Sequence, residues 1–398
     1  MRFFISFFIV LVLFSSCSEH HTGEGATSKQ TNSIDSTAYF DSLYAPLREQ
    51  IDTFFIGKLN RKEFNGSVLI ADKGHVVLKK SYGFTSPDEK DSLQLHHRFQ
   101  LASVSKPFTS AAVLLLADRG KIHLDDSIQV YLDSFPYHGI TVRMLLCHRG
   151  GLSNYNYFAD EYWSDKSKPV SNDSVLMMLY RNQPKPYYRP NEKFDYSNTG
   201  YMLLASIVEK VSGESFSSFM KKEIFDPLGM THSAIYDRCA GVEIQDRLEG
   251  YDWKDRKIED TYQNGVVGDK GMYSTVEDLF LFDRAIHKGK LLKPATWKEA
   301  FRSHNPDRGE NGKDDYGLGW RLKTSFAGYE VVYHTGWWKG FRSYFIRNIT
   351  LDQTIILTDN MKRNRFLGIE ELLDLADGGS FGSALMSDSL AVEGGNKK

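Results

Sequence analysis

Strand-like segments at both ends of the chain, with helical segments between them, constrain the fold more than any other feature. Near the start, "GSVLIADKGHVVLKKSYGF" contains two β-rich runs around Asp72, Lys73 and Gly74, the pattern of a hairpin. After residue 316, "YEVVYHTG", "FRSYFIRNIT" and "QTIILTDN" are three more strand-like runs. We therefore predict an α/β (α+β) fold. One antiparallel sheet is built from both chain ends and flanked by helices, with a mainly helical region inserted.

Helical periodicity with Gly and Pro stops predicts helices over residues 39–58, 103–119, 174–182, 200–211, 215–222, 275–287 and 366–376. We expect residues 39–380 to form a single domain, with an α/β part at 39–99 and 315–380 and a helical part at 100–314. A functional site is expected in the cleft between the two parts.

The first residues, "MRFFISFFIVLVLFSSCSEHH", indicate an export signal, because the apolar run from Phe3 to Phe14 is too short to span a bilayer. Residues 1–17 resemble a lipoprotein signal, with Cys17 as the lipid-bearing first residue of the mature protein; ordinary signal cleavage is the alternative. Residues 18–38 are expected to be a polar tether and 381–398 a polar tail. The predicted location is the bacterial cell envelope, on a periplasmic or surface face.

Composition excludes several other classes of function. The 49 Lys and Arg residues nearly balance 51 Asp and Glu, and no basic stripe is present, so nucleic acid is not an expected partner. Neither the histidines nor the cysteines have metal-ligand spacing, so no metal or cofactor is expected. Cys147 and Cys239 are expected to be free, buried thiols.

The stretch "QLASVSKPFT", residues 100–109, carries the first chemical motif. Pro107 is tolerated only in a helix's first turn, so the helix should begin close to Ser103. Residues three apart share a helix face, which brings the Lys106 amine within reach of the Ser103 hydroxyl. An uncharged amine can take the serine proton and activate the nucleophile without histidine. The alternative is an ordinary helix start, because "SFMK" at Ser218 to Lys221 has the same spacing.

Two more motifs follow in order. "DYSNTGY" contains Tyr196 and Asn198 before a predicted helix, and "VYHTGWWKGF" contains His334, Thr335 and Gly336 at the end of a predicted strand. Residues 180–182 and 262–264 repeat the Y-x-N pattern, and residues 21–23 repeat H-T-G. Their context is different, and chance seldom delivers all three motifs in the right order.

This ordered set resembles the serine β-lactamase and penicillin-binding protein superfamily. The similarity is strongest to class C β-lactamases, D-alanyl-D-alanine carboxypeptidases and related esterases. It covers about residues 64–359 and includes "MLLCHRGGL", "GDKGMYSTVEDL" and "YGLGW". The resemblance implies a β-lactamase/transpeptidase-like fold and a serine hydrolase.

The resemblance also implies a role for each motif residue. Ser103 is the expected nucleophile, Lys106 its base or proton relay, and Tyr196 the group that passes a proton to the leaving group. The expected substrate-binding residues are Asn198, His334, Thr335, Gly336 and Trp337. The oxyanion hole is expected to consist of the backbone N–H groups of Ser103 and Trp337. His148 is expected only to shape a turn.

Two residues depart from the family pattern. His334 lies where many relatives have lysine, and a neutral imidazole near pH 7 is a poorer carboxylate anchor. Lys339 and Arg342 are close enough in sequence to substitute for that lysine. Trp337 and Trp338 stand where relatives often have small residues, so the rim of the pocket is expected to be narrow or aromatic.

The sequence therefore predicts a cell-envelope serine hydrolase that acts on amide or ester bonds through an acyl-enzyme. The first hypothesis is a D-amino-acid or muropeptide peptidase of the D-alanyl-D-alanine carboxypeptidase type, with a small molecule or peptide as substrate. An esterase or a class C-like β-lactamase is the alternative among enzymes. A non-hydrolytic protein that binds penicillin or wall fragments is the alternative from another class.

Overall fold

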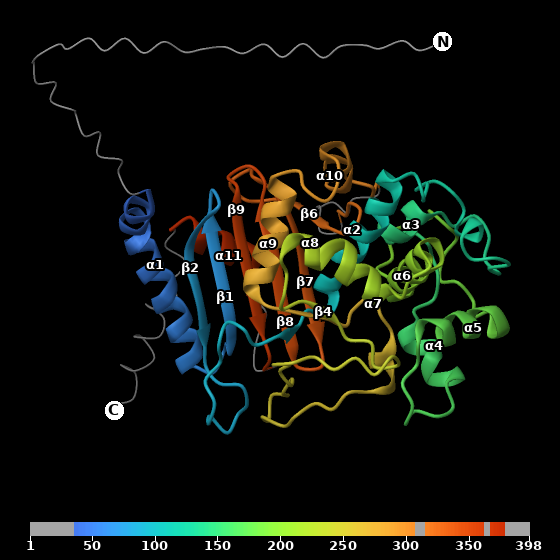
Figure 1. Cartoon of the computed structure of the whole chain (residues 1–398), viewed down its shortest axis with the longest axis horizontal. Helices are drawn as coiled ribbons and strands as arrows, with labels where there is room; N and C mark the ends of the chain where they lie inside the picture. The colour runs from blue at the N-terminus through green and yellow to red at the C-terminus, as the bar shows by residue number, and fades with distance from the viewer. Residues whose placement is uncertain (1–35, 307–314, 362–366, 379–398) are drawn as a thin grey trace, which may run out of the picture.

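The computed structural model describes residues 36–306, 315–361 and 367–378. A six-stranded sheet with the order β2-β1-β9-β8-β7-β6 forms its centre (Figure 1). The strands are β1 (Gly66–Asp72), β2 (His75–Tyr82), β6 (Arg321–Thr324), β7 (Glu330–Trp338), β8 (Phe341–Asn348) and β9 (Gln353–Asp359). All of the pairings in this sheet are antiparallel.

The two chain ends meet where β1 pairs with β9, with Gly66 opposite Asp359. The β1–β2 hairpin turns at Lys73 and Gly74, which both have positive φ, as a two-residue turn between twisted strands requires. The predicted α/β fold with an antiparallel sheet from both ends is confirmed.

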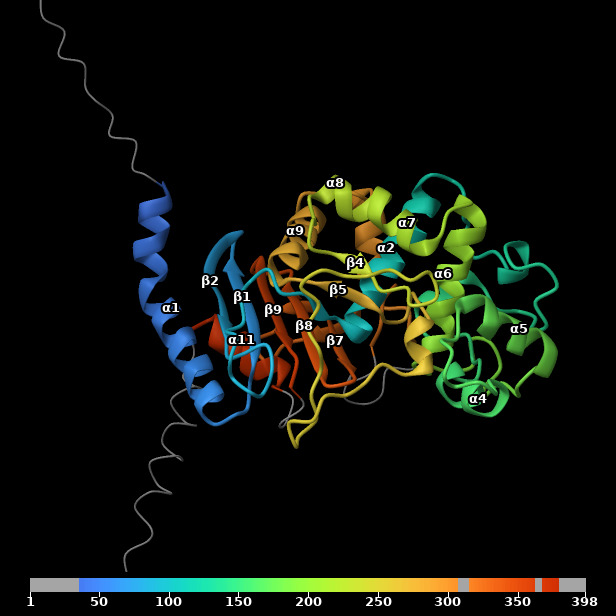
Figure 2. The same cartoon turned by 60° about the horizontal axis from the view of Figure 1, so that its bottom comes forward.

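The helices lie on both faces of the sheet and beyond its β6 end. They are α1 (Ser36–Asn60), α2 (Ser105–Asp118), α3 (Val142–Leu146), α4 (Tyr155–Tyr162), α5 (Asn172–Asn182), α6 (Asn198–Ser212), α7 (Phe216–Met220), α8 (Asp226–Leu228), α9 (Val276–His287), α10 (Pro294–Ala300) and α11 (Ile369–Ala376). A small second sheet has the order β3-β5-β4, formed by Phe99–Gln100, Met272–Ser274 and Ala234–Ile235. Figure 2 shows α4 to α7 grouped at one end of the molecule, away from α1.

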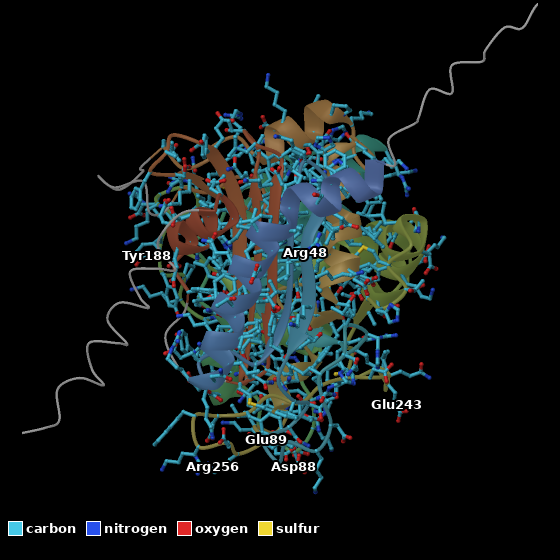
Figure 3. All side chains as sticks on the ribbon, turned by 90° about the vertical axis from the view of Figure 1, so that its left-hand side faces the viewer. Arg48, Asp88, Glu89, Tyr188, Glu243 and Arg256 are labelled. Carbon is cyan, nitrogen blue, oxygen red and sulfur yellow. The ribbon has the colours of Figure 1, made fainter. Side chains whose placement is uncertain are left out.

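Alternating side chains of the strands divide the core between the two faces of the sheet. Val332, Phe345 and Ile356 pack with α2 and α9, whereas Tyr344 and Ile346 pack with α1 and α11. Figure 3 shows α1 across the sheet, and there the Arg48 Nε donates a hydrogen bond to a carbonyl of β2 at 2.7 Å. Both faces are therefore covered by helices.

Ser103 lies in a single 3₁₀ turn, Ala102–Val104, and the α-helix itself begins at Ser105, so that Pro107 falls in its first turn. Cys147 is free and buried as predicted, but Cys239 is free and exposed, so that half of the prediction was wrong. Cys17 lies outside the described residues, within which no helix is long and apolar enough to cross a membrane.

Candidate active site

The Lys106 amine joins the first two motifs. This side chain is fully buried, and its Nζ lies 3.1 Å from Ser103 Oγ and 2.9 Å from Asn198 Oδ1. The third contact of Nζ is the backbone carbonyl of Asp269 at 2.8 Å. The serine from the 3₁₀ turn and the asparagine from the start of α6 are thus held around one nitrogen.

Hydrogen-bond chemistry fixes the direction of two of these three contacts. The Asn198 and Asp269 oxygens belong to carbonyl groups and can only accept, whereas the Ser103 hydroxyl can donate or accept. A neutral Lys106 amine has two N–H donors for the two carbonyls and one lone pair left for the Ser103 proton. The arrangement is therefore compatible with a lysine that acts as a general base.

A chain of amide groups orients Asn198. Its Nδ2 donates to Asn156 Oδ1 at 2.7 Å, which turns its oxygen toward Lys106. Asn156 in turn donates to Gln263 Oε1 at 2.9 Å. Sequence reasoning missed Asn156 and Gln263, because they reach the site only through tertiary contacts of α4 and the 262–265 turn.

The backbone of Ser103 lies against β7. Ala102 has φ of +49°, a strained conformation for a residue other than glycine, and it precedes the serine directly. A Cβ atom on Gly336 would lie 2.1 Å from the Leu101 carbonyl oxygen and 3.1 Å from the Ser103 nitrogen. Only glycine allows this approach, which brings the Ser103 N–H beside the strand that continues into Trp337. The predicted oxyanion hole would use this N–H together with that of Trp337.

Tyr196 stands at the end of the loop before α6 and is partly exposed. The centroid of its ring lies 4.9 Å from Lys106 Nζ and 4.2 Å from the ring of His148. Ser103, Lys106, Tyr196 and Asn198 therefore converge, as predicted from the motif order. Ser218 and Lys221, a decoy pair with the same spacing as Ser103 and Lys106, do not join them. Ser218 is exposed, and Lys221 forms an ion pair with Asp226 at 2.6 Å.

His334 is buried, and both of its ring nitrogens have partners. Nδ1 lies 2.9 Å from the Thr335 carbonyl oxygen and must donate to it, so Nε2 accepts from the Tyr316 hydroxyl at 3.0 Å. Burial, aided by the charge of Arg321, lowers the pKa of His334 well below its usual value near 6.5. An uncharged imidazole with occupied nitrogens is a structural support and not a cationic anchor.

The cation beside the site is Arg321, and sequence reasoning missed it. Its guanidinium carbon lies 5.2 Å from the centroid of the Tyr196 ring, and β6 places it opposite Tyr333, next to His334. Among the described residues, Arg321 takes part in none of the ion pairs. The expectation for Arg342 was wrong, because it shares a face with Tyr344 and Phe64 on the far side of the sheet.

The rim beside the site is aromatic. Trp338 is partly buried between two amines, with Lys270 Nζ at 5.0 Å and Lys339 Nζ at 5.5 Å from the centroid of its ring. Trp337 is 51% exposed and stands opposite Arg342, on the other face of the sheet. Thr335, on the same strand, is partly exposed. Of the two tryptophans expected at the rim, Trp338 lies beside the site, next to the Asp269–Lys270 segment.

A buried cluster of Tyr155, Asp269 and Lys270 stabilises the segment whose carbonyl contacts Lys106. Tyr155 donates a hydrogen bond to Asp269 at 2.8 Å, and Lys270 contacts both of these residues. Burial lowers the pKa of Lys270, an effect that the charge of Asp269 opposes. This cluster fixes the segment whose carbonyl binds Lys106. Within the described ranges, no group of His, Cys, Asp and Glu residues could hold a metal ion.

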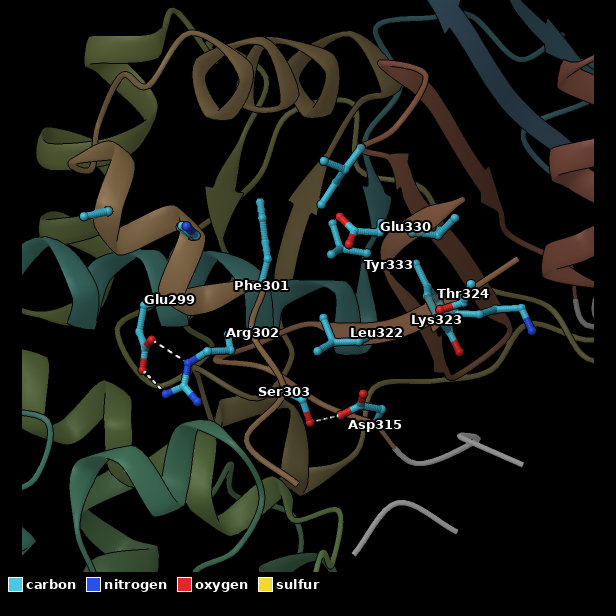
Figure 4. A pocket seen from close by; sticks show the side chains of 15 residues that line it. Glu299, Phe301, Arg302, Ser303, Asp315, Leu322, Lys323, Thr324, Glu330 and Tyr333 are labelled. Carbon is cyan, nitrogen blue, oxygen red and sulfur yellow. Dashed lines mark hydrogen bonds and ion pairs between the residues drawn. The ribbon is translucent and has the colours of Figure 1, made fainter. Parts of the chain in front are cut away.

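A concavity lies away from these residues. A groove of about 870 Å³ separates α10 from β6 and β7, with Phe301, Leu322 and Tyr333 among its lining residues (Figure 4). Glu299 pairs with Arg302, and Ser303 donates to Asp315, within this groove. None of the predicted site residues lines it.

Comparison with known proteins agrees with the motifs and the fold. The sequence profile of the Beta-lactamase family matches residues 51–365. This chain belongs to the β-lactamase family. "Penicillin-binding protein 4*" of Bacillus subtilis (strain 168) is 36% identical over 332 residues, 80% of this chain and 72% of that protein. The chain is a serine hydrolase of the β-lactamase and penicillin-binding protein superfamily.

Solved structures share the fold of this β-lactamase family member. D-amino acid amidase from Ochrobactrum anthropi SV3 aligns with a TM-score of 0.70 and 22% identity, over 85% of this chain and 99% of that one. The octameric penicillin-binding protein homologue from Pyrococcus abyssi aligns with a TM-score of 0.69 and 24% identity, over 85% and 77%. These two likenesses confirm the fold.

The buried histidines predict how stability depends on pH. The pKa values of His148 and His334 are both well below 6.5 in the folded chain, mainly through burial. The unfolded chain therefore binds more protons in acid, and the free energy of unfolding should fall as pH drops below about 6.5, by up to about 1.4 kcal/mol per pH unit for each histidine. Urea unfolding at pH 7.5, 6.5 and 5.5 measures this slope. Replacing exposed His123 by Asn should preserve it, and a flat profile would contradict two neutral buried histidines.

Proposed function

We propose that this chain removes the last residue from peptides that end in a D-amino acid, a D-alanyl-D-alanine carboxypeptidase-like reaction in the cell envelope. The observation that carries the proposal is the position of Arg321. The Arg321 guanidinium lies 5.2 Å from the ring centroid of Tyr196, the predicted leaving-group acid. Within the described residues, this guanidinium has no carboxylate partner. A leaving amino acid with a free carboxylate is the group that such a cation would bind.

The proposed reaction follows the contacts of Lys106. Its lone pair takes the Ser103 proton while Ser103 Oγ attacks the carbonyl carbon, and the N–H groups of Ser103 and Trp337 stabilise the oxyanion. As the C–N bond breaks, Tyr196 gives its proton to the leaving nitrogen and is reprotonated from Lys106. Water then hydrolyses the ester on Ser103 by the reverse sequence of proton transfers.

The names of similar proteins support this choice of substrate. The relative from Bacillus subtilis is called a penicillin-binding protein, and the structural neighbour from Ochrobactrum anthropi is called a D-amino acid amidase. Penicillin and D-amino acid amides both contain an amide bond, the kind of bond that the proposed reaction cleaves. An envelope location, by export and lipidation at Cys17, would bring the enzyme to such peptides.

Replacing Arg321 by Gln should raise KM for N-acyl-D-alanyl-D-alanine by about 10- to 100-fold. Hydrogen bonds to charged groups contribute about 1.5–3 kcal/mol, and the neutral amide cannot supply them. The matched substrate with a C-terminal amide should change little. Steady-state kinetics on both substrates at pH 7.5 is the measurement.

The control for this experiment is Lys323→Gln, which removes another cation from β6. Lys323 pairs with Glu370 at 3.0 Å, so its loss should leave both KM values unchanged. If Arg321→Gln affects the acid and the amide equally, Arg321 does not bind the carboxylate. The esterase alternative is then preferred, and rapid turnover of a cephalosporin would identify the β-lactamase alternative.

A further inference from the structure

His148 accepts hydrogen bonds from the residues directly before and after Tyr196. The backbone N–H of Asp195 donates to the His148 carbonyl at 2.8 Å, and the backbone N–H of Ser197 donates to His148 Nδ1 at 3.0 Å. The residue between these two bonds is Tyr196. Its ring lies over the imidazole, with centroids 4.2 Å apart and planes inclined by 34°.

The His148 ring is fixed by its surroundings. The side chain is 1% exposed, and the rings of Tyr316 and Tyr201 lie 4.7 and 5.0 Å away. The backbone has φ of +59°, which histidine adopts more readily than most residues other than glycine and asparagine. Such a buried ring has little freedom, so it gives the Tyr196 ring a fixed surface to pack against.

The Ser197 bond also fixes the protonation state of His148. Nδ1 accepts a hydrogen bond, so the ring proton is on Nε2 and the imidazole is neutral. Burial lowers its pKa well below 6.5, and the titratable groups that face it are Lys106, Arg321 and His334. The acceptor at Nδ1 therefore persists throughout the neutral pH range.

We propose that His148 is a positioning residue that orients Tyr196 to protonate the leaving group. This inference rests on the role assigned to Tyr196 above. The proton moves from the Tyr196 hydroxyl to the leaving atom as the bond to the acyl carbon breaks, and Lys106 returns a proton taken from Ser103. The expectation that His148 only shapes a turn assigns no such role to its side chain.

Two variants separate the contributions of the His148 side chain. His148→Asn keeps an acceptor near the position of Nδ1 and tolerates positive φ, whereas His148→Phe keeps a ring and loses the acceptor. The substrates are N-acetyl-D-alanine esters of phenols of increasing pKa, together with the corresponding anilide. Poor leaving groups need the proton from Tyr196, and good ones such as nitrophenolate do not.

His148→Phe should slow acylation by the anilide about 100-fold and acylation by the nitrophenyl ester less than about threefold, and His148→Asn should restore most of the anilide rate. In a Tyr196→Phe background, His148→Phe should add little further loss. An equal loss for every leaving group, or full additivity with Tyr196→Phe, would overturn the proposal and leave His148 as a structural residue.

The experiment distinguishes this proposal from failure of the proposed peptidase function. If the wild type cleaves the esters but no D-alanyl peptide, the peptidase assignment fails and the ester series still tests His148. If no ester acylates the wild type, crystal structures of His148→Phe and His148→Asn decide. A Tyr196 ring displaced only in the Phe variant supports the proposal, and an unmoved ring in both overturns it.

Discussion

Lys106→Met is expected to slow acylation of Ser103 by about 100- to 10,000-fold, the range typical for loss of a general base. Among the described residues, Lys106 is the group that contacts Ser103 Oγ, at 3.1 Å. Methionine has a similar shape but cannot take the proton. The rate of covalent labelling by a penicillin, followed by intact-protein mass spectrometry, measures the effect.

The same substitution leaves the oxygens of Asn198 and Asp269 without their donor, so some stability should be lost as well, about 1–3 kcal/mol for each buried acceptor that stays unpaired. Thermal unfolding of the variant separates this loss from the loss of chemistry. Lys221→Met, in the exposed decoy motif, should label at the wild-type rate. A Lys106 variant that folds and labels normally would contradict the assignment of the base.

Gly336→Ala is expected to lower kcat by about 100-fold. The added methyl group would lie 2.1 Å from the Leu101 carbonyl oxygen and 2.3 Å from Ser343 Oγ, so the backbone that carries Ser103 must move. A displacement of about 1 Å at a reacting group can cost about 100-fold in rate. Steady-state kinetics with a good ester substrate measures the change.

The control for this prediction is Gly57→Ala within α1, where a new Cβ meets only the flexible end of Arg61, at 3.3 Å. This variant should retain full activity, because alanine favours the helix and the site is not involved. Full activity in Gly336→Ala would show that the contact between β7 and the 3₁₀ turn is not needed to place Ser103.

The sheet was predictable because its long strands carry a local signal. The runs that became β1, β2, β7, β8 and β9 are rich in β-branched and aromatic residues, and their placement at both chain ends implied that they pair. Strand β6 was not predicted. It is the short polar segment Arg321–Thr324 at the edge of the sheet, and only its pairing with β7 makes it a strand.

The site was predictable where its residues share a motif and not where they meet through folding. Ser103 and Lys106 are three residues apart on adjoining helical turns, so their contact follows from spacing. Asn156 contacts Asn198, and Asp269 contacts Lys106, each from a segment distant in the sequence. No local sequence pattern predicts these contacts. Arg321 could have been found by extending a hairpin back from His334 around the Ala327–Gly328 turn.

His334 shows why a residue type alone does not determine a role. An imidazole with its usual pKa is largely neutral near pH 7 and gains a charge in mild acid. The structure buries it and occupies both nitrogens, which lowers its pKa and keeps it neutral. The H-T-G motif marks the correct strand, but the neutral state of its first residue depends on the Tyr316 hydrogen bond and the Arg321 charge, which lie outside the motif.

The most direct test of the central assignment is intact-protein mass spectrometry of the wild type and Ser103→Ala after exposure to a penicillin and to a fluorophosphonate. The wild type should gain the mass of one adduct with each reagent, and Ser103→Ala should gain none while remaining folded, because a single hydroxyl at a helix start contributes only about 0.5–2 kcal/mol. Ser218→Ala, at the decoy, should label like the wild type. An adduct that persists in Ser103→Ala, or that disappears in Ser218→Ala, would place the nucleophile elsewhere.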